Sequence, residues 1–166
     1  TTTAVLNLQR DRAITLLIAE LRELYSDASM SGRLYKISAE IKTTIESDQA
    51  NHPELLTPAR LIEPYRLRCA VMSKRLEATR ARSDGGYQSP GELSEELAVM
   101  DRSLRAHGGA LVANGRLARV RRIVGVIGFH FASLDIREHA SRHHEALSQL
   151  FDPLDVAYSV MNPEQR

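Results

Sequence analysis

Residues 129–138 read Phe129-His130-Phe131-Ala132-Ser133-Leu134-Asp135-Ile136-Arg137-Glu138, and their side chains alternate at the period of a β-strand. In a strand over about 129–136, the odd-numbered side chains, continued by Arg137, would share one face. An Asp-x-Arg pair at the C-terminal end of a strand can present a guanidinium to an anionic ligand. A half-buried strand with a surface ion pair is the alternative, and the pattern by itself favours that alternative.

Outside this stretch, apolar residues recur at helical spacing, which predicts a mainly α-helical chain with a bundle-like arrangement. The expected helices run over about 4–26, 34–47, 63–82, 90–107, 114–127 and 138–151, and the longest loop spans 48–62. A single strand among them has no convincing ladder partner for its backbone groups. Either the strand is misassigned, or its partner strands lie outside the sequence.

Local signals set several of the expected boundaries. Leu34, Ile37, Ile41 and Ile45 would form the inner stripe of the second helix. The sequence 89–92, Ser-Pro-Gly-Glu, predicts a capping box with proline at the first helical position. Gly108-Gly109 would end that helix, and Asn114 would cap the next one.

Composition limits the class of protein. The 166 residues suffice for one sizeable core, and we treat 1–166 as a single helical segment. With 22 basic and 21 acidic residues, the charge of +1 gives no global attraction to nucleic acid or anionic membranes. The chain has no apolar run of membrane-span length and no signal-peptide pattern, so a cytoplasmic location is expected. We interpret the single cysteine, Cys69, as a small core residue.

Two clusters could carry chemistry. The first is a set of arginines, and pairing with acidic neighbours or a solvated helix face is favoured over nucleic-acid binding, because few aromatic residues accompany them: Arg105, Arg116, Arg119, Arg121 and Arg122. The second is the group His139, His143 and His144, but Ala140 replaces the glutamate of an HExxH metal motif. The sequence therefore predicts no metal site in this chain.

Several motifs together resemble the phosphoenolpyruvate carboxylase family. Leu134-Asp135-Ile136-Arg137, followed by His143, is similar to the family's LDIRQ…H motif. Glu63-Pro64-Tyr65-Arg66 is similar to its EPYR helix start. Further matches are Ser29-Met30-Ser31, Ser103-Leu104, Gly108-Gly109, Ala113-Asn114-Gly115, Leu117 and Gly128-Phe129.

The resemblance covers nearly the whole chain in order. It departs from the family at Glu138, where glutamine is usual, and at His139-Ala140, where Glu-Ser is usual. The family's enzymes are several times longer and mostly helical around an eight-stranded barrel, to which the strand at 129–136 would belong. The resemblance thus implies an internal fragment, with the family's HPT histidine before Thr1 and its glycine-rich arginine loop and metal carboxylates after Arg166.

The resemblance also implies an activity for the full-length enzyme. Such enzymes convert phosphoenolpyruvate and bicarbonate to oxaloacetate and phosphate with Mg²⁺ or Mn²⁺, and a homotetramer is expected. Arg137 matches the substrate-binding arginine, and Asp135 and His143 would support it. Arg66 matches an arginine near a sugar-phosphate activator site in plant members, and a solvent-facing residue in a helix's first turn is the alternative.

A second hypothesis comes from a different class of protein. The chain could be a free-standing helical interaction domain without catalysis. The two hypotheses differ in whether the reading frame continues on both sides with the HPT segment upstream and the arginine loop downstream. Under the first hypothesis, the fragment by itself is expected to be inactive.

Overall fold

The structure, a computed structural model, describes residues 2–133, 139–154 and 158–161. By its internal contacts the chain divides into two compact units, Thr1–Ala132 and Ser133–Arg166. All regular elements of the described residues are helical. The prediction of a mainly α-helical chain is therefore confirmed. Within the same residues, no helix has both the length and the apolarity needed to cross a membrane.

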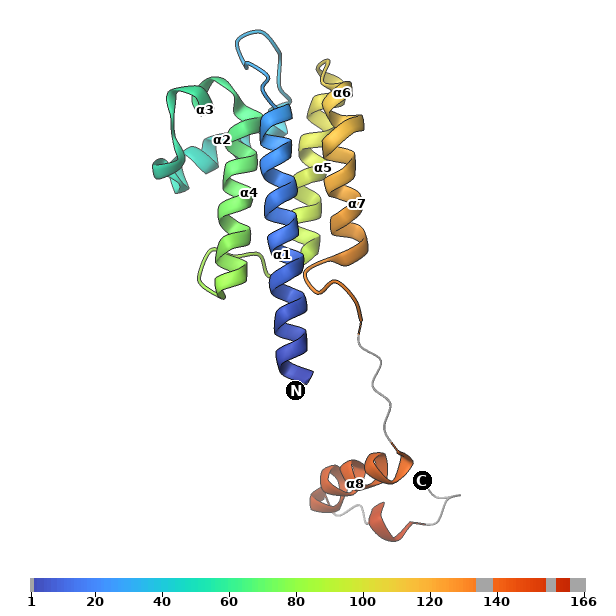
Figure 1. The fold of residues 1–166 in the computed structure, drawn as a ribbon. Helices are drawn as coiled ribbons and strands as arrows, with labels where there is room; N and C mark the ends of the chain where they lie inside the picture. The colour runs from blue at the N-terminus through green and yellow to red at the C-terminus, as the bar shows by residue number, and fades with distance from the viewer. Residues whose placement is uncertain (1, 134–138, 155–157, 162–166) are drawn as a thin grey trace. The chain divides into compact units, whose positions relative to one another are not determined.

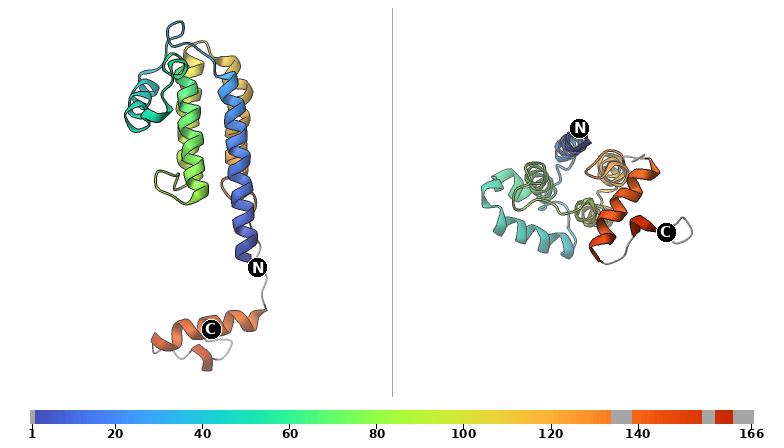
Figure 2. Two further views of the ribbon diagram at one scale, coloured as in Figure 1. Left: turned by 60° about the vertical axis from the view of Figure 1, so that its left-hand side comes forward. Right: turned by 90° about the horizontal axis from the view of Figure 1, so that it is seen from below.

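The first unit is built on long helices that alternate in direction, shown in Figures 1 and 2. They are α1 (Thr2–Asp27), α4 (Pro64–Ala81), α5 (Pro90–Ala106) and α7 (Ala118–Ile127). Helix α1 packs against both α4 and α7, and α5 packs against α7. Apolar residues at helical spacing fill the space between them, which is the main stabilising contribution. Fully buried members include Ile14, Leu17, Leu21, Leu24, Met72, Leu76, Leu93, Leu97, Met100, Leu104 and Val120.

The connection from α1 to α4 holds α2 (Ala39–Asn51), η1 (Pro53–Leu55) and α3 (Pro58–Ile62). Helix α2 begins five residues later than predicted, because Ser38 caps it by accepting a hydrogen bond from the Ile41 N–H at 3.3 Å. Leu34 is 82% exposed and does not belong to the inner stripe, whereas Ile41 and Ile45 are buried. The predicted loop 48–62 is partly helical, because it contains the end of α2 together with η1 and α3.

Helix α4 confirms the interpretation of Cys69. Pro64 starts the helix, as expected of a proline at the first helical position, and Arg82 ends it in the left-handed conformation with φ of 57°. Cys69 is completely buried, and this burial raises the pKa of its thiol to about 12. A thiol that stays protonated inside the core is a poor nucleophile.

The start of α5 differs from the predicted capping box. Ser89 has the extended backbone of a cap, but its side chain makes no capping hydrogen bond. The Glu92 carboxylate instead accepts from the Gln88 N–H at 3.2 Å. Glu92 is also in an ion pair with Arg75, so its carboxylate is shared between the helix start and α4.

The helix leading into α7 contains a wider turn. After α6 (Ala110–Val112), residues Ala113–Leu117 form the π-helical segment η2, inside which Gly115 departs from helical geometry with ψ of −114°. Asn114 lies within this segment and does not cap α7 as predicted. Its side-chain oxygen accepts a hydrogen bond from Arg105 Nη1 at 2.8 Å.

The described part of the expected strand is 129–133, of which residues 129–132 form turns and bends. Gly128 has φ of 51°, and the N–H groups of His130 and Phe131 both donate to the Ile127 carbonyl, at 3.2 and 3.0 Å. A strand needs a ladder partner, and the described residues supply none. Residues 134–136, the rest of the expected strand, lie outside the described residues.

The second unit contains α8 (Ala140–Phe151), η3 (Asp152–Leu154) and η4 (Tyr158–Val160). Tyr158 is buried, and its ring lies 6.0 Å from the rings of both His144 and Phe151. The Tyr158 hydroxyl and His144 Nδ1 are 2.9 Å apart. The predicted helix over 138–151 therefore begins at Ala140 and otherwise follows the prediction.

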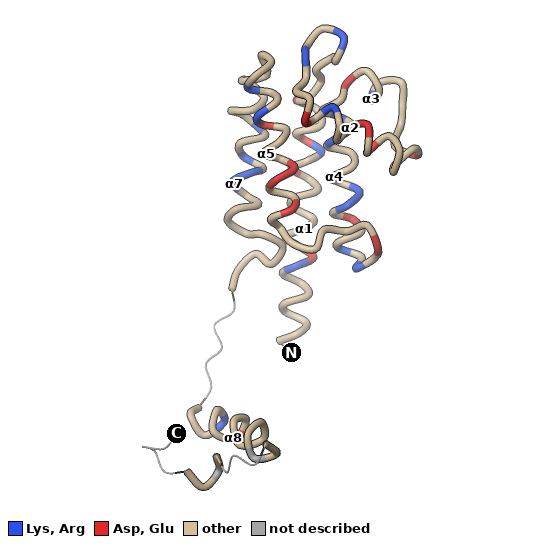
Figure 3. The backbone as a smooth tube through the Cα atoms, turned by 180° about the vertical axis from the view of Figure 1, so that it is seen from behind, with Lys and Arg blue, Asp and Glu red and all other residues tan. Residues whose placement is uncertain are grey.

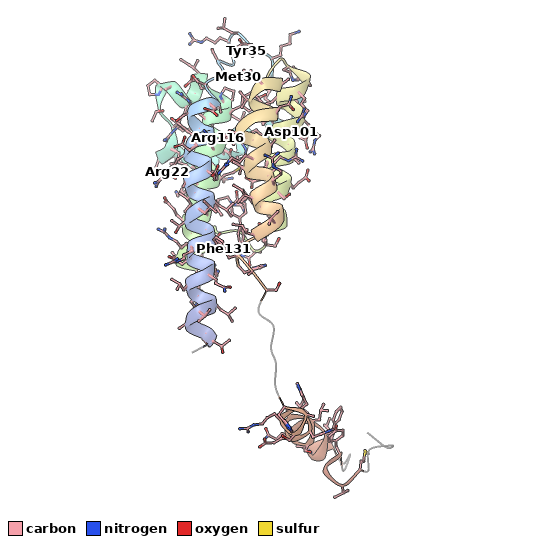
Figure 4. All side chains as sticks on the ribbon, turned by 45° about the vertical axis from the view of Figure 1, so that its right-hand side comes forward. Arg22, Met30, Tyr35, Asp101, Arg116 and Phe131 are labelled. Atoms are coloured by element: carbon pink, nitrogen blue, oxygen red, sulfur yellow. The ribbon has the colours of Figure 1, made fainter. Side chains whose placement is uncertain are left out.

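Phe129 and Phe131 provide a direct test of the turn. An alternating strand would place both rings on one face, but Phe129 is 6% exposed and Phe131, labelled in Figure 4, is 45% exposed. We expect Phe129→Ala to lower the free energy of unfolding by about 3 kcal/mol, because it removes a packed ring at the end of the core. Phe131→Ala should change it by less than about 0.5 kcal/mol.

Urea denaturation of the two alanine variants, followed by circular dichroism, measures both effects. The two substitutions delete the same group, so each serves as the other's control. Equal losses of stability at the two positions would contradict the turn.

Candidate functional site

The predicted substrate-binding residue, Arg137, and its neighbour Asp135 lie outside the described residues. The third predicted residue, His143, is exposed on α8 in the second unit. Of these three residues, the described structure therefore places only His143. It does show how the first unit holds the segment that precedes Asp135 and Arg137 in the chain.

That segment is attached to the bundle through two aromatic rings. The buried ring of Phe129 lies 6.3 Å from the ring of Tyr87, in the connection between α4 and α5. Arg75 of α4 stacks on Tyr87, with 3.9 Å between its guanidinium carbon and the ring centroid. The Tyr87 hydroxyl donates to Glu96 Oε2 at 3.0 Å. Burial, and then the charge of Glu96, raise the pKa of Tyr87 above its usual range, so its hydroxyl remains a donor.

Glu96, which accepts from Tyr87, belongs to a wider charge network, which we define as Asp48, Arg68, Arg75, Glu92 and Glu96. Arg68 of α4 is at its centre, with Nη1 2.5 Å from Asp48 of α2 and Nη2 2.7 Å from Glu96 of α5. Arg75 bonds the other oxygen of Glu96 and pairs with Glu92 at 3.1 Å. The charge network thus joins three helices through planar, two-pronged guanidinium contacts.

Burial governs the electrostatics of the charge network, because the side chain of Arg68 is only 3% exposed. Desolvation is the largest influence on Asp48 and raises the pKa of its carboxyl, against the opposing attraction of Arg68. For Arg68, desolvation is again the largest single influence and lowers its pKa. The combined attraction of Glu96 and Asp48 outweighs it, so the pKa of Arg68 is raised.

Sequence reasoning missed the charge network, although a signal was present. Arg68 lies three residues after Tyr65 and four before Met72, so helical spacing places it on the same face of α4 as these two apolar residues. A charged residue in the middle of an apolar stripe requires a buried partner. The identity of that partner could not be read from the sequence, because Asp48 and Glu96 are 20 and 28 residues away.

Four of the five arginines between residues 105 and 122 pair with acidic neighbours, which the sequence favoured over nucleic-acid binding. Figure 3 shows basic segments along α7 beside acidic segments of α5. Asp101 Oδ2 accepts from Arg105 at 2.9 Å and lies 3.1 Å from Arg121. Arg119 makes a two-pronged pair with Glu20 of α1, at 2.9 and 2.8 Å.

Arg116 and Arg122, the other two arginines of this group, differ in whether they pair with a carboxylate. Arg116, labelled with Asp101 in Figure 4, lies 3.6 Å from Glu23 and 3.5 Å from Asp27 of α1. Arg122 is exposed, and no acidic partner for it occurs among the described residues. Overall, the positive charge of this region is largely used to join helices.

Arg66, the predicted activator-site residue, is tied to the C-terminal end of α1. Its Nε donates to the Tyr25 carbonyl at 3.0 Å and its Nη1 to Glu63 at 2.8 Å. The guanidinium carbon lies 5.0 Å from the centroid of the Tyr25 ring. A cation at a helix C-terminus also interacts favourably with the helix dipole. Arg66 therefore has a structural role beyond that of a solvent-facing residue, and its regulatory role stays a prediction.

His139, which directly precedes α8, and His144, within it, have different partners. His139 Nδ1 lies 2.9 Å from the Ser141 hydroxyl, whereas His144 contacts Tyr158. Within the described ranges, no three His, Cys, Asp or Glu side chains are grouped as metal ligands would be. The described residues therefore do not fit a divalent cation.

Comparison with known proteins identifies the family. The family profile described as phosphoenolpyruvate carboxylase matches residues 1–166. The chain belongs to the phosphoenolpyruvate carboxylase family. A phosphoenolpyruvate carboxylase from Rhodopseudomonas palustris is 36% identical over 174 residues, covering 97% of this chain and 18% of the relative. One from Chromobacterium violaceum is 38% identical over 156 residues, covering 86% of this chain and 16% of the relative.

Membership of the phosphoenolpyruvate carboxylase family confirms the resemblance seen in the motifs. The chain spans only 16–18% of the length of these two relatives. Within that span lie the EPYR-like start of α4, the turn at Gly128-Phe129 and the sequence Leu134–Arg137. The charge network and the Tyr87–Phe129 contact connect α4, the helix that begins at the EPYR-like motif, with the turn at Gly128-Phe129.

We predict that Arg68→Met destabilises the chain by about 3 kcal/mol at pH 7, because it leaves the Asp48 and Glu96 carboxylates buried without their cation. Arg102→Met is the matched control, since the Arg102 side chain is 51% exposed and also pairs with two carboxylates, Glu40 and Glu95. The control should lose much less stability. Urea denaturation measures both free energies of unfolding.

The loss in Arg68→Met should also depend on pH. Asp48, whose pKa is already raised by burial, would lose the cation that opposes the increase. A carboxyl with a raised folded pKa binds its proton more readily when folded, so it destabilises the fold as pH rises above about 4. The stability gap between Arg68→Met and the parent chain should therefore narrow from pH 7 to pH 5. A gap independent of pH would contradict this account.

Proposed function

We propose that the protein acts as part of a phosphoenolpyruvate carboxylase, a lyase that joins bicarbonate to phosphoenolpyruvate and releases oxaloacetate and phosphate. The observation that carries the proposal is the match of the family profile to the whole chain. The relatives named phosphoenolpyruvate carboxylase support it at 36–38% identity. The reaction is an anaplerotic carbon fixation that supplies the tricarboxylic acid cycle.

Arg137 is the residue we assign to substrate binding. Its guanidinium stays charged at all physiological pH values and can hold two phosphate oxygens at once. Asp135, two residues earlier, would orient that guanidinium rather than exchange protons. His143 would support the same site. The support for these assignments is the motif Leu134–Arg137 in the sequence.

The chemistry explains why an arginine suits this position. Bicarbonate oxygen attacks the phosphorus of phosphoenolpyruvate, the bond from phosphorus to the enol oxygen breaks, and carboxyphosphate and an enolate form. Carboxyphosphate then yields CO₂ and phosphate, and the enolate carbon bonds to the CO₂. A fixed cation beside the phosphate stabilises the negative charge that develops during the transfer.

The remaining parts of the site would come from outside this chain. Mg²⁺ or Mn²⁺, when bound to the complete enzyme, would supply positive charge near the substrate, and we assign its ligands to residues beyond this chain. We further propose that the complete enzyme is a cytoplasmic homotetramer that binds neither nucleic acid nor membrane. Arg66 would lie near its activator site.

The purified 166-residue chain is predicted to form no oxaloacetate from phosphoenolpyruvate, bicarbonate and Mg²⁺. The reason is that the described residues group no metal ligands and the chain covers 18% or less of its relatives. Coupling to malate dehydrogenase and following NADH at 340 nm (about the absorbance maximum of NADH) measures the rate. A rate above the blank without protein would overturn the prediction.

A chimera tests the role of Arg137 in a complete enzyme. This chain would replace the aligned segment of the Chromobacterium violaceum relative, and the chimera should carboxylate phosphoenolpyruvate. In the chimera, Arg137→Gln should lower kcat/KM for phosphoenolpyruvate by about 100-fold, as expected when a donor to developing charge is lost.

Arg142→Gln is the matched control in the same chimera, because the Arg142 side chain is 65% exposed and its ion pair with Glu145 is also at the surface. It should leave kcat/KM almost unchanged. Full activity of the Arg137→Gln chimera would remove Arg137 from the substrate site.

A further inference from the structure

A pocket of about 450 Å³ lies on the first unit between α1, α4 and the stretch that holds η1 and α3. Its size is within the range of small-molecule sites, about 300–1,000 Å³. Part of its wall is apolar, formed by the ring of Tyr25 together with Leu55 and Ala70. The rest of the wall carries charged side chains from all three parts of the fold.

Arg60 of α3 is the unusual member of that wall. It is partly buried, and no carboxylate lies within ion-pair distance of it among the described residues. Its Nη1 donates to the Leu55 carbonyl at 2.8 Å, and its guanidinium carbon lies 5.6 Å from the centroid of the Tyr25 ring. Its Nε is enclosed and has no hydrogen-bond partner. A partly desolvated cation that has no counter-ion lowers its free energy when an anion binds beside it.

Two further cations line the pocket. Arg22 of α1 is 3.9 Å from Glu77, and both side chains are more than half exposed, so this pair holds Arg22 weakly. Lys74 of α4 is bonded to Glu54 at the same pocket. Glu77 and Glu54 therefore balance the charges of Arg22 and Lys74. The positive charge of Arg60 is left without a carboxylate to balance it.

Arg66 contributes nothing to this pocket. Its three nitrogens are directed to Glu63 and to the carbonyls of Tyr25 and Ser26, and it does not line the cavity. It contacts the same Tyr25 ring as Arg60, at 5.0 Å from the centroid. The pocket is thus a separate feature from the position that the family resemblance associates with an activator.

We propose that this pocket binds a small organic oxyanion, a carboxylate or a phosphate ester, that carries an apolar or aromatic body. The oxyanion binds to the face of the Arg60 guanidinium that lines the pocket, and Arg22 turns toward it from its weak pair with Glu77. The body lies against Tyr25, Leu55 and Ala70. This inference does not depend on the carboxylase activity, because it uses only residues of the first unit.

Isothermal titration calorimetry of the 166-residue chain with phenyl phosphate, benzoate and inorganic phosphate tests the proposal. We expect saturable binding of phenyl phosphate or benzoate with Kd below about 1 mM, and weaker binding of inorganic phosphate. The stronger of the two aromatic probes identifies the preferred oxyanion. Inorganic phosphate binding as tightly as both would overturn the apolar part of the proposal.

Substitutions locate the binding. Arg60→Gln should weaken it by about tenfold, because a charge-assisted hydrogen bond is lost. Ala70→Leu should weaken it similarly by filling the pocket without changing any charge. Arg12→Gln is the control, since Arg12 is exposed on α1, does not line the pocket, and changes the net charge equally.

Arg22→Gln provides a second test if Arg60→Gln unfolds, because it leaves the hydrogen bond from Arg60 to Leu55 intact. It should also weaken binding, by severalfold. Absence of saturable binding up to about 10 mM would overturn the proposal, since millimolar affinity is the weakest that such a site should show. Equal binding by the parent, Arg60→Gln, Ala70→Leu and Arg22→Gln would also overturn it.

Discussion

The first unit depends on the guanidinium of Arg68, which is held between two carboxylates from different helices. Apolar residues can slide past one another at modest cost, but a buried cation needs its partners at fixed places. Asp48 and Glu96 therefore set the relative positions of α2, α4 and α5. Glu96 also holds Tyr87, and Tyr87 packs on Phe129. The direction in which the chain leaves α7 thus follows from a charge buried in α4.

The sequence predicted the helices well because apolar periodicity is a local property. Errors occurred where two local signals competed. Leu34 continued an apolar pattern, but Ser38 supplied a better helix start. Asn114 had the chemistry of a cap, yet its side chain bonds Arg105 within a wider helical turn. Alternation at 129–133 was the strongest strand signal, but a strand also needs a neighbour, and Phe129 packs on Tyr87 instead.

The candidate site was harder to predict than the fold. The motif around Arg137 was found from resemblance, since no spacing rule distinguishes it from a surface ion pair. The charge network was missed because its members are distant in the chain. The position of Arg68 on a buried helix face did indicate that this arginine needs buried acidic partners. Arg60 gave no signal at all in the sequence, because its lack of a counter-ion is a property of the folded surface around Tyr25.

The π-helical turn at Ala113–Leu117 has a consequence for how this family changes over evolution. A π turn accommodates one residue more than an α turn, so the helix before it and the helix after it each keep their own contacts with the core. Gly115, which has no side chain to place, sits at the point where the extra residue is absorbed. Alignment gaps of one residue between homologues should therefore gather at this turn, where an insertion or deletion leaves the packing of α5 and α7 in register.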